Sequence, residues 1–541
     1  MTDVMDDTDY RSKSFNRNDA EFRHPLWMTE SHFIFHLWRD GEGHLNCHKD
    51  TQGYPVCSPR HLSQLCIHTL ITNPLRLYKT RAQDIPHDLY PVMLTEAIHR
   101  RELESINYLV SSWPHEVLDV QSLLPLEEYI DPHYLTAPIE GHENMSLMDC
   151  FLFGLLTLRT VSRLKCINFS GFKHDRKLGK ELARLAILWI SPSKRNVDYI
   201  HGVLSQSLDI SRDKVQRYLN RISCIYANMD PFVNHGNTVG PVTVVFECKL
   251  TLDDVAIGLG LQHETPFRFH CRRLWYEPIS EVVLQTRYIH KLLEPRNVTH
   301  LDFEDPSICS DVMRFDSLLE CLLLLPSLTT VSLPNTIHVN VHSNAAYELN
   351  QTLRGLKDLR KLNLSSSNLR DGLDNLLNGL TQPIEYLGLR DCRLNKTDIQ
   401  FLLQWDNIAS VKELNLSRNN LKPLAYLCVS LLTKLRKIIC FSISYCCFTT
   451  IGLRQIVRRC IECDHLKYLA IQSFTPPPLP DVQELLQDCT TIFSLQKCLL
   501  LPETYAFPGS NDSDRIHNRE MLLDIAYQYL EHMGRTDIDL E

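Results

Sequence analysis

Long apolar runs and glycine are both scarce in this chain of 541 residues. Apolar runs such as residues 322–325, which end at Pro326, fall far short of the ~18 residues of a membrane-spanning helix. Glycine contributes only 19 residues, which excludes a glycine-rich fibre or linker protein. The first residues are acidic and polar and contain no apolar segment typical of a signal peptide. We therefore expect no membrane partner.

Basic residues are also in deficit. Lys and Arg number 56 against 65 Asp and Glu, so the formal charge is −9. A chain without a strong positive field is a poor candidate for binding nucleic acid. The 19 cysteines do not follow the pattern of a short secreted disulfide scaffold. We therefore expect free thiols and a location in the cytoplasm, the nucleus or both.

Signatures of catalysis and of metal binding are absent. The sequence contains no nucleophile elbow, P-loop, dinucleotide fingerprint or HExxH zinc motif. Cys460 and Cys463 resemble half of a zinc site, but structural zinc needs four ligands and no second pair lies nearby. We therefore predict a protein that is not an enzyme and that has no catalytic residue, cofactor or metal.

Leucine, in contrast, is abundant along most of the chain. It recurs in the leucine-rich-repeat pattern, which has apolar residues at positions 1, 4, 6 and 11 and Asn or Cys at position 9. One copy fits throughout, with Val411, Leu414, Leu416, Asn419 and Leu421. Seven first positions follow one another at nearly constant intervals: Val298, Leu328, Leu359, Ile384, Val411, Ile438 and Leu466. The pattern predicts one short parallel strand and one helix per repeat, stacked into an α/β leucine-rich-repeat solenoid, or horseshoe.

The ninth position has a predicted structural role. Asn419 and the cysteines Cys392 and Cys446 occupy it in three of the copies, and Ser367 occupies it in a fourth. An Asn or Cys side chain there can hydrogen-bond the turning backbone, whose polar groups would otherwise be buried without partners.

The chain divides into five predicted segments. Strand-like stretches at 242–246 and 267–274, and an apolar pattern at 164–169, extend weaker repeats upstream of residue 298. A helical pattern from Leu522 to Met533 stops at Gly534 and can cover the last repeat. The segments are a disordered or unassigned stretch at 1–55, a helical module at 56–130, a linker at 131–145, repeats at 146–500 and a capping helix region at 501–541.

Four local motifs resemble the PRAME family. IPHDLYP at 85–91 and LVSSWP at 109–114 are similar to the family's N-terminal signature LPxELxP…LVxxWPF. FRFHCRRL at 267–274 is similar to the family's LRLCCRxL strand, and residues 372–394 are similar to its LDxLLxxxxxPLExLxLxxCxL repeat. The resemblance covers about 58 to 541. It implies a repeat protein that serves as a substrate receptor of a cullin-2 ubiquitin ligase or as a regulator of signalling or transcription.

The resemblance gives the first predicted helix a second interpretation. An elongin C-binding BC-box is a helix with Leu, then a small residue four positions later, and an aliphatic residue four positions after that. Leu62, Cys66 and Leu70 match this spacing, and Leu65 lies on the same face. Such a stripe can lie in a hydrophobic groove of a partner. The simpler alternative is that the stripe packs into the protein's own core, as apolar helix faces usually do.

A second motif follows shortly after the first helix. The cullin-2 box has an aliphatic residue, a proline, an apolar residue three positions on and another four positions later. Ile85, Pro86, Leu89 and Met93 match it, whereas Asp88 stands where the cullin-5 version has a second proline. The pair of motifs predicts binding to elongin B/C and cullin-2, although both helices could simply cap the solenoid.

The combined prediction is a substrate-recognition subunit of a cullin-2/elongin B/C ligase. Its unknown protein substrate would bind exposed strand positions of the solenoid that alternate with the buried leucines, such as Glu413, Asn415 and Ser417. The alternative is a signalling scaffold or inhibitor that binds a protein without ubiquitin transfer. In that case Leu62 and Cys66 should be buried within the chain, whereas a receptor should leave their stripe partly exposed.

Overall fold

The computed structural model describes residues 62–540 except for the segments 125–133, 140–141, 171–177, 207–209, 230–239, 250–253, 277–292, 304–311, 335–344, 474–478 and 501–513. The predicted segment 1–55 lies outside the described residues. The described elements are α-helices and β-strands that alternate along most of the chain.

A parallel sheet of 13 strands runs through the described part of the chain. Neighbouring strands are consecutive in the sequence except that the hairpin strands β2 and β3 form a sheet of their own. Parallel pairing requires a crossover after each strand, which a helix or a loop supplies. The strands are β1 Val117–Asp119, β4 Cys166–Asn168, β5 Val242–Lys249, β6 Phe267–Tyr276, β7 His300–Phe303, β8 Thr330–Ser332, β9 Lys361–Asn363, β10 Tyr386–Gly388, β11 Glu413–Asn415, β12 Cys440–Ser442, β13 Tyr468–Ala470, β14 Lys497–Leu499 and β15 Asp539–Leu540.

The predicted repeats are confirmed as a solenoid-like α/β fold. Each of the strands β7 to β13 begins two residues after the first position that the sequence pattern assigned to it. Within a repeat the fourth and sixth positions, for example Leu414 and Leu416, are buried. A further repeat that the pattern analysis did not assign begins at Leu495 and supplies β14.

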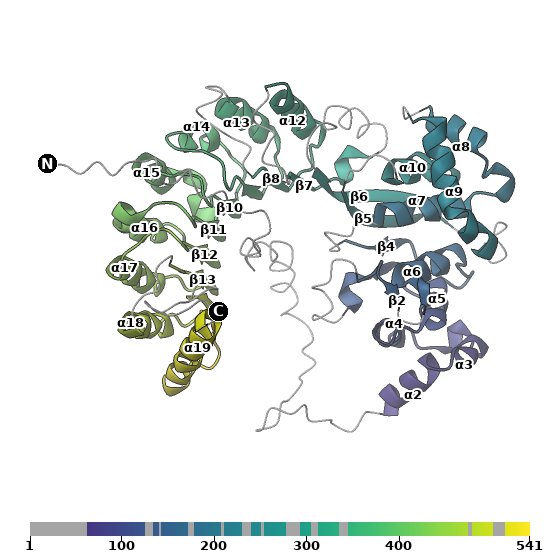
Figure 1. Cartoon of the computed structure of the whole chain (residues 1–541), viewed down its shortest axis with the longest axis horizontal. Coiled ribbons are helices and arrows are strands. Elements are labelled where there is room, and N and C mark those ends of the chain that lie inside the picture. Colours follow the sequence, from purple (N-terminus) through teal and green to yellow (C-terminus); the bar gives the residue numbers. More distant parts are fainter. Residues whose placement is uncertain are drawn as a thin grey trace. The chain divides into compact units, whose positions relative to one another are not determined.

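Helices follow the strands and cover one face of the sheet locally. Figure 1 shows α15 to α18 along one side of the strands β10 to β13. The helices after the sheet begins are α6 Leu147–Leu156, α7 Leu178–Trp189, α8 Val197–Leu204, α9 Arg212–Met229, α10 Asp254–Gly260, α12 Val312–Leu324, α13 Ala345–Gly355, α14 Leu373–Leu377, α15 Lys396–Gln404, α16 Ala425–Leu432, α17 Thr450–Cys460, α18 Leu479–Thr490 and α19 Asp514–His532.

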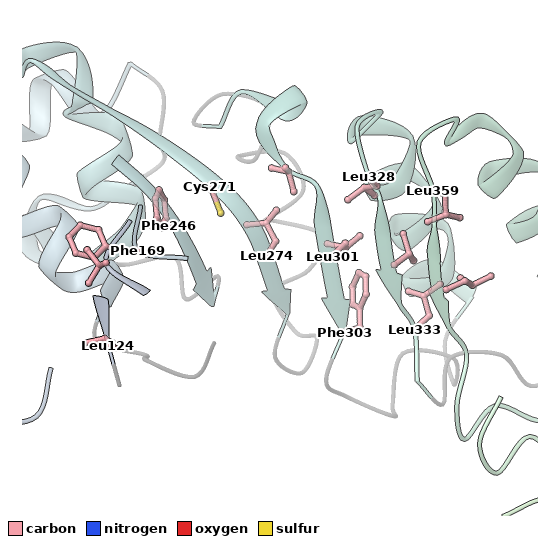
Figure 2. Packing of buried hydrophobic residues seen from close by; sticks show 14 of the residues in the cluster. Leu124, Phe169, Phe246, Cys271, Leu274, Leu301, Phe303, Leu328, Leu333 and Leu359 are labelled. Carbon is pink, nitrogen blue, oxygen red and sulfur yellow. The ribbon is translucent and has the colours of Figure 1, made fainter. Parts of the chain in front are cut away.

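One hydrophobic core continues from strand to strand. Phe246 of β5, Leu274 of β6, and Leu301 and Phe303 of β7 belong to one cluster of buried residues (Figure 2). Because each repeat adds its own apolar layer to the core of the next, no single repeat could bury its leucines alone.

The N-terminal end differs from the predicted boundaries. Helices α2 Leu62–Ile71, α3 Pro74–Lys79, α4 Leu89–His99 and α5 Leu103–Ser111 form the expected helical module. The first sheet strand, β1, nevertheless lies at 117–119, inside the range expected to be helical. The expected linker contains the antiparallel strands β2 Pro138–Ile139 and β3 His142–Ser146. These strands are too short to leave a strand signal in the sequence.

Asn419 shows why an Asn suits the ninth position. Its side-chain oxygen accepts hydrogen bonds from the backbone N–H groups of Cys392 and Leu394, each at 3.0 Å. Its amide group donates to the carbonyl oxygens of Leu389 and Leu416, each at 2.8 Å. One buried side chain therefore satisfies backbone groups of two repeats, as predicted.

Cysteine performs part of the same role. The Cys392 thiol donates to the carbonyl oxygen of Leu364 at 3.3 Å, and the Cys446 thiol donates to that of Leu416 at 3.2 Å. Each bond again joins one repeat to the preceding one. Burial raises the pKa of both thiols, so they remain protonated donors.

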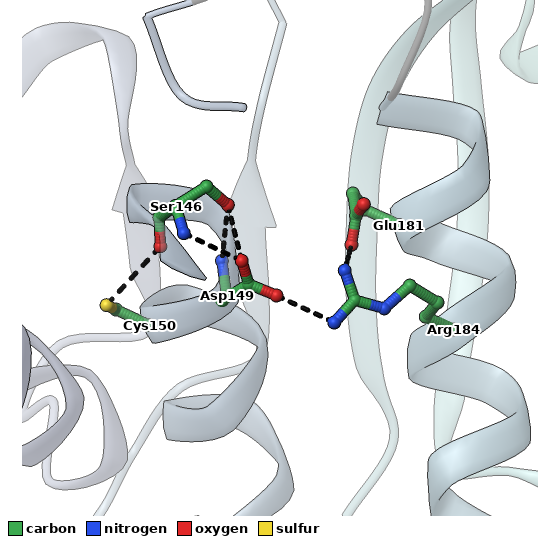
Figure 3. A network of polar contacts seen from close by, with 5 residues as sticks. All are labelled: Ser146, Asp149, Cys150, Glu181 and Arg184. Carbon is green, nitrogen blue, oxygen red and sulfur yellow. Dashed lines mark hydrogen bonds and ion pairs between the residues drawn. The ribbon is translucent and has the colours of Figure 1, made fainter. Parts of the chain in front are cut away.

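A buried ionic cluster joins α6 to α7 (Figure 3). Ser146 caps α6 by accepting the Asp149 N–H at 3.2 Å, and the Asp149 carboxylate accepts the Ser146 N–H at 2.8 Å. Asp149 also binds the Arg184 guanidinium at 2.7 Å, and Glu181 pairs with the other end of that group. Burial lowers the pKa of Arg184, but the two carboxylates outweigh burial and raise it overall.

The C-terminal end contains a helix and a final strand. α19 includes the predicted face, with Ala526 and Leu530 buried, and the chain turns at Gly534, whose φ is +69°. Strand β15 then pairs with β14, which the sequence did not indicate. Arg535 stabilises this end by donating to the carbonyl oxygens of Thr490 and Leu495 at 2.7 and 3.0 Å.

Candidate protein-binding surfaces

Helix α2 packs mainly through a face other than the predicted stripe, although Leu70 of the stripe also packs against the core. Ile67 and Ile71 are buried, and the Ser105 hydroxyl donates to the Ile71 carbonyl oxygen at 2.8 Å, which attaches the end of α2 to α5. Cys66 is exposed and Leu70 is half-buried. The predicted stripe and the packed face are thus adjacent but not identical.

Two members of the predicted elongin-binding set cannot be placed. The side chains of Leu62 and Leu65 lie outside the described part of the structure, although both residues belong to α2. The sequence analysis did not identify Ile67 and Ile71 as core residues. Their i, i+4 spacing is itself a core signal, but it competes with the stripe of Leu62, Cys66 and Leu70 on a helix that is apolar on several sides.

The cullin-box residues divide between core and surface. Ile85 and Met93 are 4% and 1% exposed and belong to the hydrophobic core, so they are not available as partner contacts in this conformation. Pro86 is exposed and Leu89 is half-buried. The same segment exposes Val92 to 50%, which the sequence analysis did not identify. The apolar pattern of one helix does not show which of its apolar residues the neighbouring helices will cover.

Aromatic contacts fix the turn that precedes α4. The rings of Tyr90 and Trp113 meet edge to face at 6.1 Å, so the IPHDLYP and LVSSWP motifs touch each other. The hydroxyl groups of Tyr90 and Tyr108 donate to the carbonyl oxygens of Ala82 and Thr80 at 3.1 and 2.7 Å. These contacts hold the exposed residue Pro86 on a rigid support, which favours a defined surface over a flexible loop.

The helical module also packs against the first repeat. A Cβ atom added to Gly154 of α6 would lie 2.7 Å from the Cβ atom of Val110 in α5, so only glycine permits this approach. The Arg159 N–H donates to the Ser111 carbonyl oxygen at 2.8 Å. The module therefore caps the solenoid, as the simpler interpretation predicted, and it still leaves Cys66, Pro86 and Val92 in contact with solvent.

The predicted target-binding residues on β11 and after it are only partly accessible. Glu413 and Asn415 are half-buried. Ser417 is 5% exposed, and its hydroxyl shares a hydrogen bond of 2.6 Å with Ser442 and accepts the Ser444 N–H at 3.2 Å. The prediction that Ser417 is an exposed contact residue is therefore wrong, because neighbouring repeats close over small side chains at this position.

The eighth repeat position has a left-handed backbone, which the sequence analysis did not identify. Few residues other than Gly, Asn and Asp adopt this conformation without a cost of about 1–2 kcal/mol. Each N–H at this position donates to the carbonyl group of the next repeat, for example Arg418 to Ser444 at 2.8 Å. This left-handed position can be found in the sequence, because it is the residue directly before the Asn or Cys of the ninth position. Its occupants in four successive repeats are Ser366, Asp391, Arg418 and Tyr445, with φ between 53° and 61°.

Comparison with known proteins identifies the N-terminal region. Residues 58–148 match the PRAME N-terminal domain. The N-terminal part of the chain is thus similar to the PRAME N-terminal domain. This domain extends beyond the helical module and includes β1 and the β2–β3 hairpin.

Proteins of known sequence extend the similarity beyond this PRAME N-terminal domain. The chain is 25% identical over 488 residues to leucine-rich repeat-containing protein 14 of Xenopus laevis, which covers 84% of this chain and 89% of that protein. The Mus musculus and Homo sapiens proteins of the same name are 32% and 31% identical over 135 and 132 residues, which covers 24% of this chain and 27% of each relative. The predicted resemblance to the PRAME family is thus confirmed, and these similarities indicate a protein-binding repeat protein.

Two further properties concern the described residues alone. No helix among them is both long and apolar enough to cross a bilayer. No three His, Cys, Asp or Glu side chains in the same part of the chain are arranged to hold a metal ion.

Proposed function

We propose that this protein is the substrate-recognition subunit of a cullin-2/elongin B/C ubiquitin ligase. The PRAME N-terminal domain would bind elongin C through α2, and the repeats would hold the target. The receptor would make no covalent bond itself. It would raise the effective concentration of target lysines near a ubiquitin-loaded enzyme.

The observation that carries the proposal is the orientation of α2. The helix packs on its own protein through Ile67 and Ile71, while Cys66 remains exposed and Leu70 half-buried. A small residue at an exposed helix position permits close approach of a partner surface, as a helix-in-groove interaction requires. If the stripe were core, Cys66 would be buried.

A second candidate function is a signalling scaffold that binds a protein without ubiquitin transfer. The burial of Ile85 and Met93 favours it, because two of the four cullin-box residues pack into the core. Under the ligase proposal the cullin contact would instead come from Pro86, Leu89 and Val92, of which Val92 is 50% exposed.

Direct binding of purified components tests the elongin contact. The full-length chain is mixed with elongin B/C and analysed by size-exclusion chromatography, beside the variants Cys66→Phe and Cys447→Phe. Cys447 is an exposed cysteine of the repeats, so the second variant makes the same chemical change away from α2. The proposal expects wild type and Cys447→Phe to bind and Cys66→Phe to fail. Absence of wild-type binding would make the scaffold the leading function.

A second variant tests the cullin contact. Val92→Arg places a charge at an exposed position of α4 without removing a core residue. The proposal expects this variant to keep elongin B/C and to lose cullin-2 in a three-component binding assay. If Val92→Arg binds cullin-2 as wild type does, the cullin surface does not lie on this part of α4.

A further inference from the structure

Side chains of three successive repeats form a column beside the ends of the strands. Asp391, Arg418 and Tyr445 occupy the eighth position of consecutive repeats. The Asp391 and Arg418 N–H groups donate to the carbonyl oxygens of Ser417 and Ser444 at 2.9 and 2.8 Å, so the backbone ladder continues past the strands. Hydrogen-bonded neighbours of this kind lie ~4.8 Å apart, and equivalent side chains therefore stack.

The column brings guanidinium groups together. Burial and the nearby charge of Arg418 lower the pKa of Arg390 to about 10, so the two arginines share one environment. The Arg418 guanidinium lies over the Tyr445 ring, with Cζ 5.4 Å from the ring centre. Asp391 interacts with Arg390, Arg418 and also Arg393. Among the described residues, this group contains three guanidinium groups and one carboxylate.

The backbone is unfavourable for the larger side chains Arg393, Arg418 and Tyr445. Asp391, Arg393, Arg418 and Tyr445 have φ of 53°, 54°, 60° and 60°, in the left-handed region that glycine adopts most easily. Glycine or asparagine would make the same backbone hydrogen bonds with less strain. Bulky residues retained in a strained conformation point to a use of the side chain itself.

The degree of exposure suits a binding surface. Arg390, Arg418 and Tyr445 are half-buried, while Asp391 and Arg393 are exposed. A half-buried guanidinium is less screened by water than a fully exposed one, and its planar fork can bind a carboxylate through two hydrogen bonds. The ring of Tyr445 holds Arg418 from one side and offers an apolar contact of its own.

We propose that Arg390, Arg393, Arg418 and Tyr445, which we call the arginine column, form a docking surface for an acidic segment of a partner protein. A Glu or Asp side chain of that segment pairs with Arg390 and Arg418 across two neighbouring repeats. The formal charge of −9 opposes an extended polyanion such as a nucleic acid more than it opposes one or two carboxylates.

This inference deepens the proposed function, because it specifies the chemistry of the protein that the repeats bind. It rests on the repeats being the partner-binding part of the chain. It does not depend on elongin or cullin, since the arginine column lies in repeats 384–448 and α2 lies at residues 62–71.

Peptide binding tests the charge preference. Fluorescent oligoglutamate, oligoglutamine and oligolysine peptides of equal length, and a single-stranded oligonucleotide, are titrated with the full-length chain and followed by anisotropy. The expected result is that oligoglutamate alone binds, and that binding weakens when salt rises from about 50 to about 500 mM. No oligoglutamate binding, or tighter binding of the oligonucleotide than of oligoglutamate, would overturn the proposal.

Variants locate the site. Arg418→Gln removes one charge and should weaken oligoglutamate binding about tenfold, as loss of a charge-assisted hydrogen bond does. Arg418→Lys keeps the charge but not the planar fork, and should give a smaller loss. Arg436→Gln is the matched control, since Arg436 is an exposed arginine outside the arginine column. Equal affinity for Arg418→Gln and Arg436→Gln would place the peptide elsewhere and refute the assignment.

One more comparison separates this proposal from the ligase proposal. Arg418→Gln is also mixed with elongin B/C, and it should bind as wild type does while oligoglutamate binding falls. If wild type binds oligoglutamate but not elongin C, the arginine column stands and the ligase function fails. If it binds elongin C but Arg418→Gln keeps full affinity for oligoglutamate, the ligase function stands and the arginine column fails. Circular dichroism of each variant verifies that the fold is retained.

Discussion

The strands of the sheet's two ends are spaced in different ways. From β7 to β14 the strands begin at nearly constant intervals, for example at residues 386, 413 and 440 for β10, β11 and β12. In contrast, β1, β4 and β5 begin at residues 117, 166 and 242. The long early intervals contain additional helices, among them α7, α8 and α9. When strands are evenly spaced along the chain, each repeat can pair with the next in the same register. When the spacing varies, each strand needs its own specific contacts.

The two regions also bury polar groups differently. The early region holds Arg184 between Asp149 and Glu181, and Arg273 of β6 is bonded to Asp302 of β7 at 2.5 Å where the two regions meet. The regular region relies mainly on neutral side chains that satisfy the backbone, such as Asn419 and Cys446. The comparison teaches that a regular turn can be satisfied by a small neutral side chain at one position, such as Asn419 or Cys446, whereas contacts between helices, from α6–α7 to α17–α18, use matched ions.

The largest expected effect is in the early region. Arg184→Ala leaves the buried carboxylate of Glu181 and the half-buried carboxylate of Asp149 without their shared cation, which should cost about 3–5 kcal/mol. Arg212→Ala breaks a pair whose side chains are 64% and 77% exposed, and should cost at most about 1 kcal/mol. Urea unfolding followed by circular dichroism measures both variants. Equal transition midpoints would show that the ionic cluster does not stabilise this region.

The corresponding change in the regular region is Asn419→Ala. It removes five buried hydrogen bonds to backbone groups of two repeats and should cost about 2–4 kcal/mol. The neighbouring residue Asn420 is exposed, so Asn420→Ala should change stability by less than about 0.5 kcal/mol. Thermal unfolding of the two variants checks the difference. A small effect for Asn419→Ala would mean that water replaces the lost hydrogen bonds.

A smaller effect concerns alkaline pH. Burial raises the pKa of Cys428 to about 12, above the ~8.5 of an unfolded thiol. The unfolded state therefore loses its proton first, and stability falls as pH rises from about 8.5 towards 12. Cys428→Ala should lessen this fall by about 1.4 kcal/mol per pH unit, as measured from urea midpoints at several pH values. Ser430→Ala, on the same helix and without a titratable group, should keep the wild-type slope.

The smallest effect is kinetic and compares the surfaces of the two regions. Cys66 in α2 and Cys447 in the repeats are exposed, whereas Cys392 and Cys446 are buried with a raised pKa. Maleimide labelling of the native chain, followed by peptide mass spectrometry, should modify the first two rapidly and the last two only on unfolding. Rapid labelling of Cys392 would contradict the packing of the ninth position.

Local sequence pattern was sufficient where one rule repeats. The first positions from Val298 to Leu466 placed seven strands, because period and burial are both encoded within a single repeat. The role of Asn419 followed from the same pattern, since the turn it satisfies has the same geometry in each copy. The strands β5 and β6 were predicted over 242–246 and 267–274, and the structure extends them to 242–249 and 267–276.

Pattern alone failed where contact with a distant element decides the outcome. β1 and β15 are short and acquire their strand character by pairing with β4 and β14. The buried face of α2 depends on which side α5 covers, and the burial of Ser417 depends on the next repeat. The ionic cluster at Arg184 joins residues 35 positions apart, and no local rule links them.

The sequence by itself therefore determined the repeat register, the strand-and-helix alternation and the chemistry of the ninth position, since each follows from apolar spacing and from local backbone hydrogen bonding. Only the tertiary structure decided which apolar residues of the PRAME N-terminal domain are core and which face solvent. It also decided that the eighth-position residues Asp391, Arg418 and Tyr445 lie side by side in consecutive repeats. Both outcomes depend on packing between elements, and packing is settled by the shape of the partner surface and not by the hydrophobicity of either element alone.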